Sequence, residues 1–250
     1  MSAKEIVLKP ITAKEANSLV KANHYSGKVV TNSQIHIGIY YRGKLEGAMQ
    51  FGPSIDKRRV GMLVTGTKWN EFIELNRMAF SDNLPRNSES RALAVAMKLL
   101  KKHAPQLKWV VSFADATQCG DGTIYRAAGF VLTQIKANQQ MLMWNGRVIA
   151  KKTLDNENYP KINGKYFSRH LLDTGEAIPL SGFQLRYIYF LDQSVRKNLS
   201  VTEIPFSQIS EMGATMYKGL RPGSIDSDAP DNLSGESGAS PTSRLQPKDN

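Results

Sequence analysis

The sequence predicts an α/β fold in which a central twisted sheet is flanked by helices. Residues 107–113 form a short apolar run rich in Val, Trp and Phe, the composition of a strand buried on both faces. On either side of this run, segments with helical periodicity alternate with segments that have strand periodicity. With 250 residues, 41% of them hydrophobic, the chain can bury one sizeable core.

The first part of the chain predicts a strand, a helix, a hairpin and another strand. Residues 5–9 fit a first strand, and Thr12 with Glu15 forms a capping box that opens a helix reaching Asn23. Alternating residues over 34–51, with a turn at 42–44, predict a hairpin. We expect residues 52–68 to form a loop. Residues 71–80 predict the next strand, in which polar residues interrupt the apolar pattern and so suggest a site.

The second part adds two helices and the remaining strands. Ser88 is the expected cap of an amphipathic helix over 92–103. After the strand over 107–113, a short helix can begin at Asp121 or Thr123, and Gly129 is placed to end it. The pair at 145–146, Asn-Gly, predicts a type I′ hairpin. Residues 183–191 predict the last strand, and residues 150–182 form a polar insertion whose structure the pattern does not define.

Positive charge is unevenly distributed along the chain. There are 33 Lys and Arg against 22 Asp and Glu, a net charge of +11. Residues 222–250 hold five acidic and two basic residues, a net −3, so residues 1–221 carry +14. We expect residues 1–221 to form a single catalytic domain and residues 222–250 a disordered acidic tail. The basic surplus favours a nucleic-acid partner. Lys57, Arg58 and Arg59 are the candidate DNA-binding cluster, although such a run is usually only a solvated face.

Cysteine content and apolar runs indicate the compartment. Cys119 is the single cysteine, which rules out an internal disulfide and gives no zinc-ligand spacing. No run of about 18 apolar residues is present, and the N-terminus lacks the apolar region of a signal peptide. We therefore expect a soluble protein of a reducing cytosol, with no membrane partner.

Polar islands lie where the predicted strands end, the edge at which an open α/β sheet usually binds its ligand. They include His24-Tyr25-Ser26-Gly27, Glu74-Leu75-Asn76-Arg77, Arg86-Asn87-Ser88-Glu89-Ser90, Asp115 and Tyr125. Four of these residues have a purely structural alternative. Asp115 fits a turn, Tyr125 can simply pack with Phe130, His24 can cap its helix, and Arg77 can pair with Glu74 or another neighbour.

The element order resembles that of the GNAT acyltransferases. In that superfamily the pyrophosphate of acyl-CoA binds at a loop and helix N-terminus after the fourth strand, where this chain has Arg86, Asn87, Ser88 and Ser90. A Tyr shortly before Gly-Phe is also typical, as in Tyr125-Arg126-Ala127-Ala128-Gly129-Phe130. The resemblance therefore implies a GNAT-like fold and acetyl-CoA or a related acyl donor as cofactor, with Tyr125 beside it.

The polar islands, together with Ser112-Phe113-Ala114-Asp115 and Arg186-Tyr187-Ile188-Tyr189-Phe190, resemble the Mom family of Mu-like bacteriophages over residues 6–191. That resemblance implies an enzyme that places a methylcarbamoyl or acetamido-type group on adenine N6 in double-stranded DNA and protects phage DNA from host restriction. The setting it implies is the host cytoplasm. A homodimer is a further expectation.

Adenine N6 chemistry gives each candidate catalytic residue a role. The base must be flipped out of the duplex. Asp115 can accept the N6 proton, Arg77 can stabilise an oxyanion or a donor phosphate, and Tyr125 can protonate the leaving group. His24 can act as a base or, with Asp115, bind Fe²⁺. Two alternatives stay open: a GNAT N-acetyltransferase acting on a protein or small amine, and a DNA-binding protein with an inactive GNAT fold.

Overall fold

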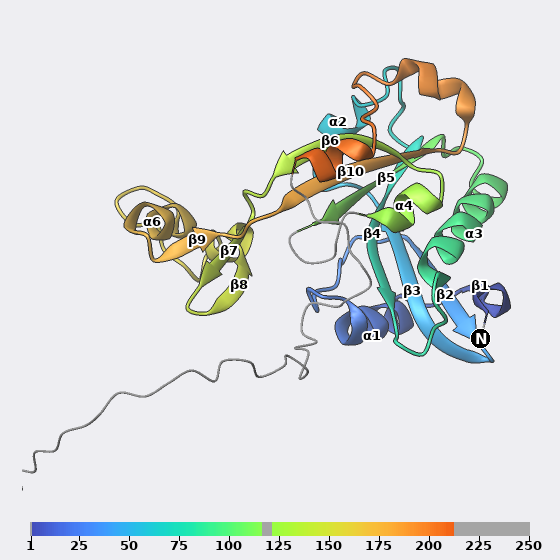
Figure 1. The fold of residues 1–250 in the computed structure, drawn as a ribbon, viewed down its shortest axis with the longest axis horizontal. Coiled ribbons are helices and arrows are strands. Elements are labelled where there is room, and N and C mark those ends of the chain that lie inside the picture. Colours follow the sequence, from blue (N-terminus) through green and yellow to red (C-terminus); the bar gives the residue numbers. More distant parts are fainter. Residues whose placement is uncertain (1, 117–121, 213–250) are drawn as a thin grey trace, which may run out of the picture. The chain divides into compact units, whose positions relative to one another are not determined.

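The computed structural model describes residues 2–116 and 122–212 (Figure 1). Its helices and strands follow in this order: η1 Ala3–Glu5, β1 Val7–Pro10, α1 Ala13–Asn23, β2 Ile35–Tyr41, β3 Lys44–Gly52, α2 Lys57–Gly61, β4 Phe72–Phe80, α3 Ser88–His103, β5 Trp109–Asp115, α4 Thr123–Ala127, β6 Val131–Ala137, β7 Met141–Trp144, β8 Arg147–Ala150, α5 Lys151–Leu154, α6 Phe167–Thr174, β9 Ala177–Pro179, β10 Phe183–Phe190, η2 Gln193–Asn198 and α7 Ser207–Glu211. The α/β class and the order of elements implied by the GNAT resemblance are confirmed.

The central sheet has seven strands in the order β1-β2-β3-β4-β5-β10-β6. Its one parallel pair is β4 with β5, and the other neighbours are antiparallel. Because α3 connects β4 to β5, the two strands run the same way, and both C-terminal ends lie toward the same edge of the sheet. That edge carries the polar islands around Arg77 and Asp115.

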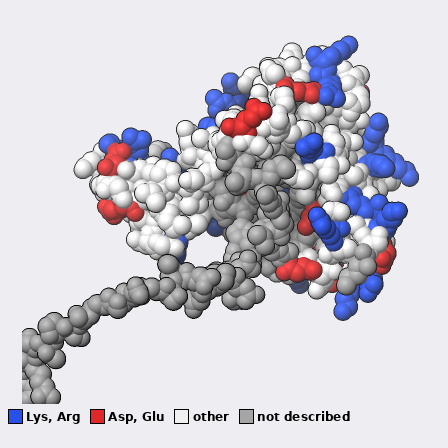
Figure 2. All heavy atoms as spheres, in the orientation of Figure 1, with Lys and Arg blue, Asp and Glu red and all other residues white. Residues whose placement is uncertain are grey.

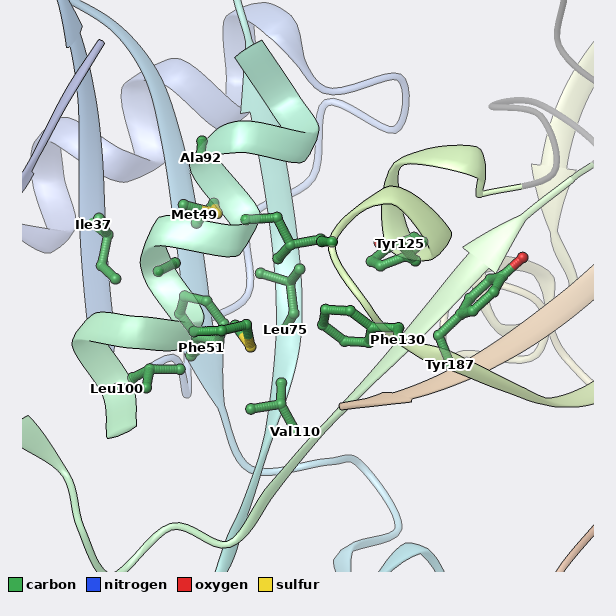
Figure 3. Packing of buried hydrophobic residues seen from close by; sticks show 14 of the residues in the cluster. Ile37, Met49, Phe51, Leu75, Ala92, Leu100, Val110, Tyr125, Phe130 and Tyr187 are labelled. Carbon is green, nitrogen blue, oxygen red and sulfur yellow. The ribbon is translucent and has the colours of Figure 1, made fainter. Parts of the chain in front are cut away.

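Helix α3 covers one face of the sheet. Its Leu93, Met97 and Leu100 are buried in a cluster that also contains Phe51 and Leu75 (Figure 3). The same cluster continues past Val110 to Tyr125 of α4, Phe130 and Tyr187. We call this side of the sheet the α3 face.

The opposite side, which we call the α1 face, is covered by α1, by residues 53–70 and by η2. Gln50 points away from its core neighbours Met49 and Phe51 and donates to Asn17 of α1 at 2.9 Å. Further along the sheet, Trp109 stacks on Phe72, with ring centroids 4.6 Å apart and an interplanar angle of 8°. Successive residues of a strand point to opposite sides of the sheet. The face of each site residue therefore follows from its position relative to these reference residues.

Capping and turn chemistry agree with the expected elements at several points. The hydroxyl of Thr12 accepts from Glu15 N, and the Glu15 carboxylate accepts from Thr12 N, which completes the capping box. Asn145 and Gly146 both have positive φ, 50° and 70°, as a type I′ turn requires. Gly129 ends α4 with φ of 89°. No helix in the described ranges is long and apolar enough to cross a membrane.

Two local expectations are wrong. Residues 52–68 are not all loop, because Asp56 caps the short helix α2 by accepting from Arg59 N at 3.1 Å. Ser88 is not the cap of α3. Asn87 takes the N-cap position, with φ of 68°, and Ser88 is the first helical residue.

The insertion over 150–182 belongs to a second, three-stranded sheet of order β8-β7-β9. This small lobe is inserted between β6 and β10 and has its own core of Leu142, Leu154, Leu171 and Ala177 (Figure 1). Lys28 Nζ donates to Thr153 Oγ1 at 3.0 Å, so the lobe contacts the loop that follows α1. The predicted boundary at residue 221 and the acidic tail lie outside the described residues.

Candidate active site

The two parallel strands β4 and β5 separate halfway along their length. They pair only over Phe72–Glu74 and Trp109–Val111, although β4 continues to Phe80 and β5 to Asp115. A β-bulge accompanies the separation: Gln50 of β3 lies opposite Arg77 and Phe51 lies opposite Leu75, which leaves Asn76 as the extra residue. Beyond Glu74 and Val111 the facing strand edges are therefore not hydrogen-bonded to each other, and the candidate residues gather around this divergence.

Arg77 lies on the α1 face and holds the loop that follows α1. Its Nε donates to the carbonyl of Lys28 at 2.9 Å, and its Nη1 donates to the carbonyl of Asn76 at 2.7 Å. The guanidinium therefore bonds to these two carbonyl groups and does not form the alternative ion pair with Glu74. The two carbonyls fix its plane beside His24.

His24 ends α1, since its backbone N–H donates to Val20 O, so the capping alternative is correct for its backbone. Its ring is also engaged: Nδ1 accepts from Ser26 N at 3.1 Å and lies 2.9 Å from Ser26 Oγ. Burial, reinforced by the Arg77 charge, lowers the pKa of His24 to about 4. Because a backbone N–H can only donate, Nδ1 is the acceptor and the neutral ring carries its proton on Nε2. In this arrangement His24 offers a hydrogen-bond donor at Nε2.

Glu74 adds a carboxyl group that was absent from the expected catalytic set. Burial raises its pKa, while the Ser54 hydroxyl, the Asn76 amide and the Arg77 charge oppose the increase. Ser33 Oγ donates to Asn76 Oδ1 at 3.1 Å and ties the same loop to the bulge. The polar interruption of this strand was visible in the sequence, but the bulge that separates Glu74 from Arg77 was not.

Asp115 is the last residue of β5 and lies opposite Gln184 of β10. By alternation from Trp109 and Val111, it belongs to the α1 face and is half-buried. It is thus on the same face as Arg77, one strand away. The nearby predicted residues Cys119 and Asp121 lie outside the described residues.

Tyr125 lies on the α3 face, at the start of α4. Ser112 Oγ donates to Tyr125 Oη at 2.9 Å, and both side chains are buried. The Tyr125 ring stacks on Tyr187 at 4.9 Å and meets Phe130 edge-on at 5.4 Å (Figure 3). The alternative that Tyr125 simply packs is therefore correct for its ring. Its hydroxyl, in addition, is hydrogen-bonded. Ser112 and Tyr187 belonged to recognised motifs, but the sequence did not indicate their contacts with Tyr125.

The predicted donor site lies at the start of α3, also on the α3 face. A groove of about 320 Å³ is lined by Asn87 and Ser90 together with Arg91 and Lys98. The first amides of a helix have no intrahelical acceptor, and Asn87 supplies no side-chain cap. These features fit a phosphate-bearing donor. Ser88 differs from its neighbours, because it is buried and donates to Pro85 O at 2.6 Å.

The remaining predicted residues are dispersed. Arg86 is exposed in the turn before α3. Lys57, Arg58 and Arg59 form α2 on the α1 face. Figure 2 shows that Lys and Arg outnumber Asp and Glu on the visible face and gather along its edge over α3. The basic surplus is thus distributed over more of the surface than α2 alone.

The predicted iron site has no support in the described residues. No group of three or more His, Cys, Asp or Glu is close enough there to hold a metal ion. In addition, Nδ1 of His24 already accepts a backbone hydrogen bond and Nε2 carries the proton. The side chains described do not fit the ion, and we derive no catalytic step through it.

Comparison with known proteins gives the family. The model of the Mom protein family matches residues 5–208. The chain belongs to the Mom family. It is 32% identical to the methylcarbamoylase Mom of Escherichia phage Mu over 206 residues, which cover 79% of this chain and 80% of that relative. The Mom resemblance that the polar islands indicated is confirmed.

Solved acetyltransferases share a more distant likeness with this Mom-family chain. An IAA acetyltransferase from Bacillus cereus is 14% identical, with a TM-score of 0.44, and the match covers 74% of this chain and 99% of that one. A GNAT family acetyltransferase from Elizabethkingia anophelis, solved with acetyl-CoA bound, is 15% identical, with a TM-score of 0.42 and coverage of 74% and 98%.

Proposed function

We propose that this Mom-family chain is a transferase that places a methylcarbamoyl-type group on the N6 amine of adenine in double-stranded DNA. The observation that carries the proposal is membership of the Mom family, at 32% identity to a methylcarbamoylase across most of both chains. In a phage-infected cell such a product shields DNA from host restriction enzymes. The host cytoplasm is the proposed place of action, because both the DNA and the metabolic donor are there.

The arrangement of side chains supports transfer across the β4–β5 divergence. Tyr125 and the groove at α3 lie on the α3 face, and His24, Arg77 and Asp115 lie on the α1 face. A donor held at α3 and a base held on the α1 face would meet where the two strands no longer pair. We propose an acyl donor, acetyl-CoA or a related thioester. Acetyl-CoA itself carries no nitrogen in its acyl group and would give N6-acetyladenine, so a methylcarbamoyl product needs a related thioester that already contains that nitrogen.

Each side chain has one task in the proposed transfer. With a donor thioester whose acyl group already contains the methylcarbamoyl nitrogen, the N6 lone pair forms a bond to the carbonyl carbon, the carbon–sulfur bond to the leaving group breaks, and Asp115 accepts the N6 proton. Nε2–H of His24 and the Arg77 guanidinium stabilise the oxyanion, a contribution worth about 2.7–4 kcal/mol per donor in other enzymes. Tyr125 protonates the leaving group, and the Ser112 hydroxyl stabilises the phenolate that remains.

Nucleoside mass spectrometry tests this function directly. DNA from cells that express the soluble chain is digested, and the deoxyadenosine fraction is compared with DNA from cells that express Asp115→Ala. We expect a heavier deoxyadenosine only with the wild-type chain. Unmodified deoxyadenosine from cells that contain folded protein and normal metabolites would contradict the proposal. An acetylated protein or small amine in the same cells would instead favour the N-acetyltransferase alternative.

A further inference from the structure

A second groove lies on the α1 face, between α2 and the segment that leads into β4. It has a volume of about 390 Å³ and combines a basic rim with an apolar wall. Lys57, Arg58 and Lys68 form the rim, and Met62, Trp69 and Phe72 contribute the apolar surface. Of these, Trp69 is 64% and Met62 is 61% exposed. An exposed apolar surface rimmed by polar residues is the kind that marks a binding site.

The Trp69 ring is held in place on one side and open on the other. Lys57 Nζ lies 4.5 Å from its centroid and 5.8 Å from that of Phe72. Partial burial between the two rings lowers the pKa of Lys57. One face of the Trp69 indole contacts the Lys57 ammonium group. The exposed surface of Trp69 therefore comes from the rest of the ring. This is a flat apolar surface flanked by cations.

Hydrogen bonds anchor the walls of the groove to the body of the protein. Thr65 N donates to Asn198 O at 2.8 Å, and Ser200 Oγ donates to Met62 O at 2.8 Å. Trp109 Nε1 donates to Thr67 Oγ1 at 3.1 Å. Contacts to two distant parts of the chain fix the segment, so the groove is part of the folded surface.

The positive charge of the groove favours a negatively charged partner. Within the described residues, none of the ion pairs involves Lys57, Arg58, Arg59 or Lys68. The three rim cations attract phosphate, and an exposed aromatic ring stacks on a nucleobase. A strand of nucleic acid supplies both groups at once, whereas an acidic peptide would leave the indole unmatched.

The groove adjoins the candidate active site on the same face of the sheet. Phe72 in its wall lies five residues before Arg77 on β4, about 16 Å along the strand. Gly61 packs against the Phe72 ring, where an added Cβ would lie 3.2 Å from Cε1. A DNA strand whose adenine enters the site can therefore reach the groove with a nucleotide a few positions away.

We infer that the groove between α2 and Trp69 binds a nucleotide of the DNA strand outside the modified adenine, with its base stacked on Trp69 and its phosphate on Arg58 and Lys68. The inference rests on the proposed function for the identity of the strand. A base stacked on Trp69 must have left the helical stack, so the contact favours unpaired or mismatched DNA over a fully paired duplex.

Binding of labelled DNA in the absence of any donor tests the groove. We expect Trp69→Ala to weaken binding of a single strand and of a mismatched duplex about tenfold, within the range for loss of one stacked base. Trp69→Phe should stay within about twofold of wild type, since an aromatic face remains. Arg58→Ala should lower the slope of log affinity against log salt by about one. Melting temperatures establish that each variant is folded.

A matched control comes from the small lobe, where Lys161 Nζ lies 4.6 Å over the exposed ring of Tyr166. Tyr166→Ala should leave DNA affinity unchanged. Equal losses from Trp69→Ala and Tyr166→Ala, no loss from Trp69→Ala, or a loss confined to fully paired duplex would each overturn the inference. These experiments measure DNA binding, whereas the proposed function is tested by modification of deoxyadenosine. A chain that binds DNA through Trp69 but leaves deoxyadenosine unmodified would contradict the proposed function and would leave the inference about the groove intact.

Discussion

At the scale of single residues, the proposed chemistry depends on which proton each side chain holds. The Ser112 hydroxyl donates to Tyr125 Oη, a hydrogen bond that strengthens when the phenol loses its proton. On the α1 face, the neutral His24 ring accepts at Nδ1 and donates at Nε2. One face of the sheet thus offers an acid, and the other offers a hydrogen-bond donor and the carboxylate of Asp115.

Replacement of Tyr125 by Phe should abolish most of the activity and leave the fold intact. The ring keeps its stacking on Tyr187, and loss of the hydrogen bond with Ser112 costs about 1 kcal/mol of stability. Removing a general acid slows a reaction by about 100-fold or more. Asp115→Ala and Arg77→Ala should cause comparable losses. Modified deoxyadenosine per folded molecule is the measurement, and a large fall in melting temperature with activity retained would show structural roles instead.

The low pKa of His24 predicts a loss of stability in acid. In the folded protein the pKa is about 4, below the ordinary value of 6.5, so the unfolded chain binds the proton first as pH falls. The contribution of His24 is fully present above pH 6.5 and is lost progressively toward pH 4. His24→Gln should flatten this part of the stability curve, measured by urea unfolding. The exposed His103→Gln is the control, and parallel curves for wild type and His24→Gln would refute the assignment.

At the scale of elements, local sequence signals located most of the sheet. Strand β10 and the hairpin β2–β3 have apolar alternation, and Thr12 with Glu15 marks the start of α1. The errors occurred where tertiary contacts decide the structure. The basic segment that forms α2 is too short to show a helical period, and Asn87 adopts its left-handed N-cap conformation in a turn that buries Ser88.

The candidate site was only partly predictable for a similar reason. His24 and Asp115 stood out because they are polar residues at the ends of predicted elements, and Arg77 stood out because it interrupts the apolar pattern of a strand. The grouping of these residues on one face, with Tyr125 on the other, follows from strand alternation and from the bulge at Asn76. A bulge arises from pairing with a neighbouring strand, so no pattern within residues 71–80 reveals it.

Gly122 fixes the distance between α4 and β10. Its φ is +74°, and an added Cβ would lie 2.7 Å from Cε2 of Tyr187. Gly122→Ala should destabilise the protein by about 2–4 kcal/mol, from the left-handed backbone and from displacement of the ring. Gly146→Ala measures the cost of the left-handed backbone alone, because Gly146 has φ of +70° and nothing lies within 4 Å of the added Cβ. Urea unfolding measures the loss of stability in both variants. Equal losses would mean that the Tyr187 ring moves aside at no cost in free energy.

At the scale of the whole molecule, the two partners of the proposed reaction approach from different faces. The predicted donor groove at α3 and the Tyr125 hydroxyl are on one side, and His24, Arg77 and the Trp69 groove are on the other. Separation of this kind lets a large polyanion bind without covering the donor. Whether the chain acts as a homodimer stays a prediction that light scattering tests.

The acidic residues near the C-terminus should weaken DNA binding through charge alone. Deleting residues 222–250 removes a net −3 and leaves +14 on the rest of the chain. Because affinity for DNA rises with the phosphates that cations neutralise, the truncated chain should bind a duplex equally well or more tightly at low salt. Its melting temperature should be unchanged. Replacing the five acidic residues by Asn or Gln in the full chain should reproduce the gain. Anisotropy titrations across a salt series measure both variants, and weaker binding after truncation would instead make this segment part of the DNA site.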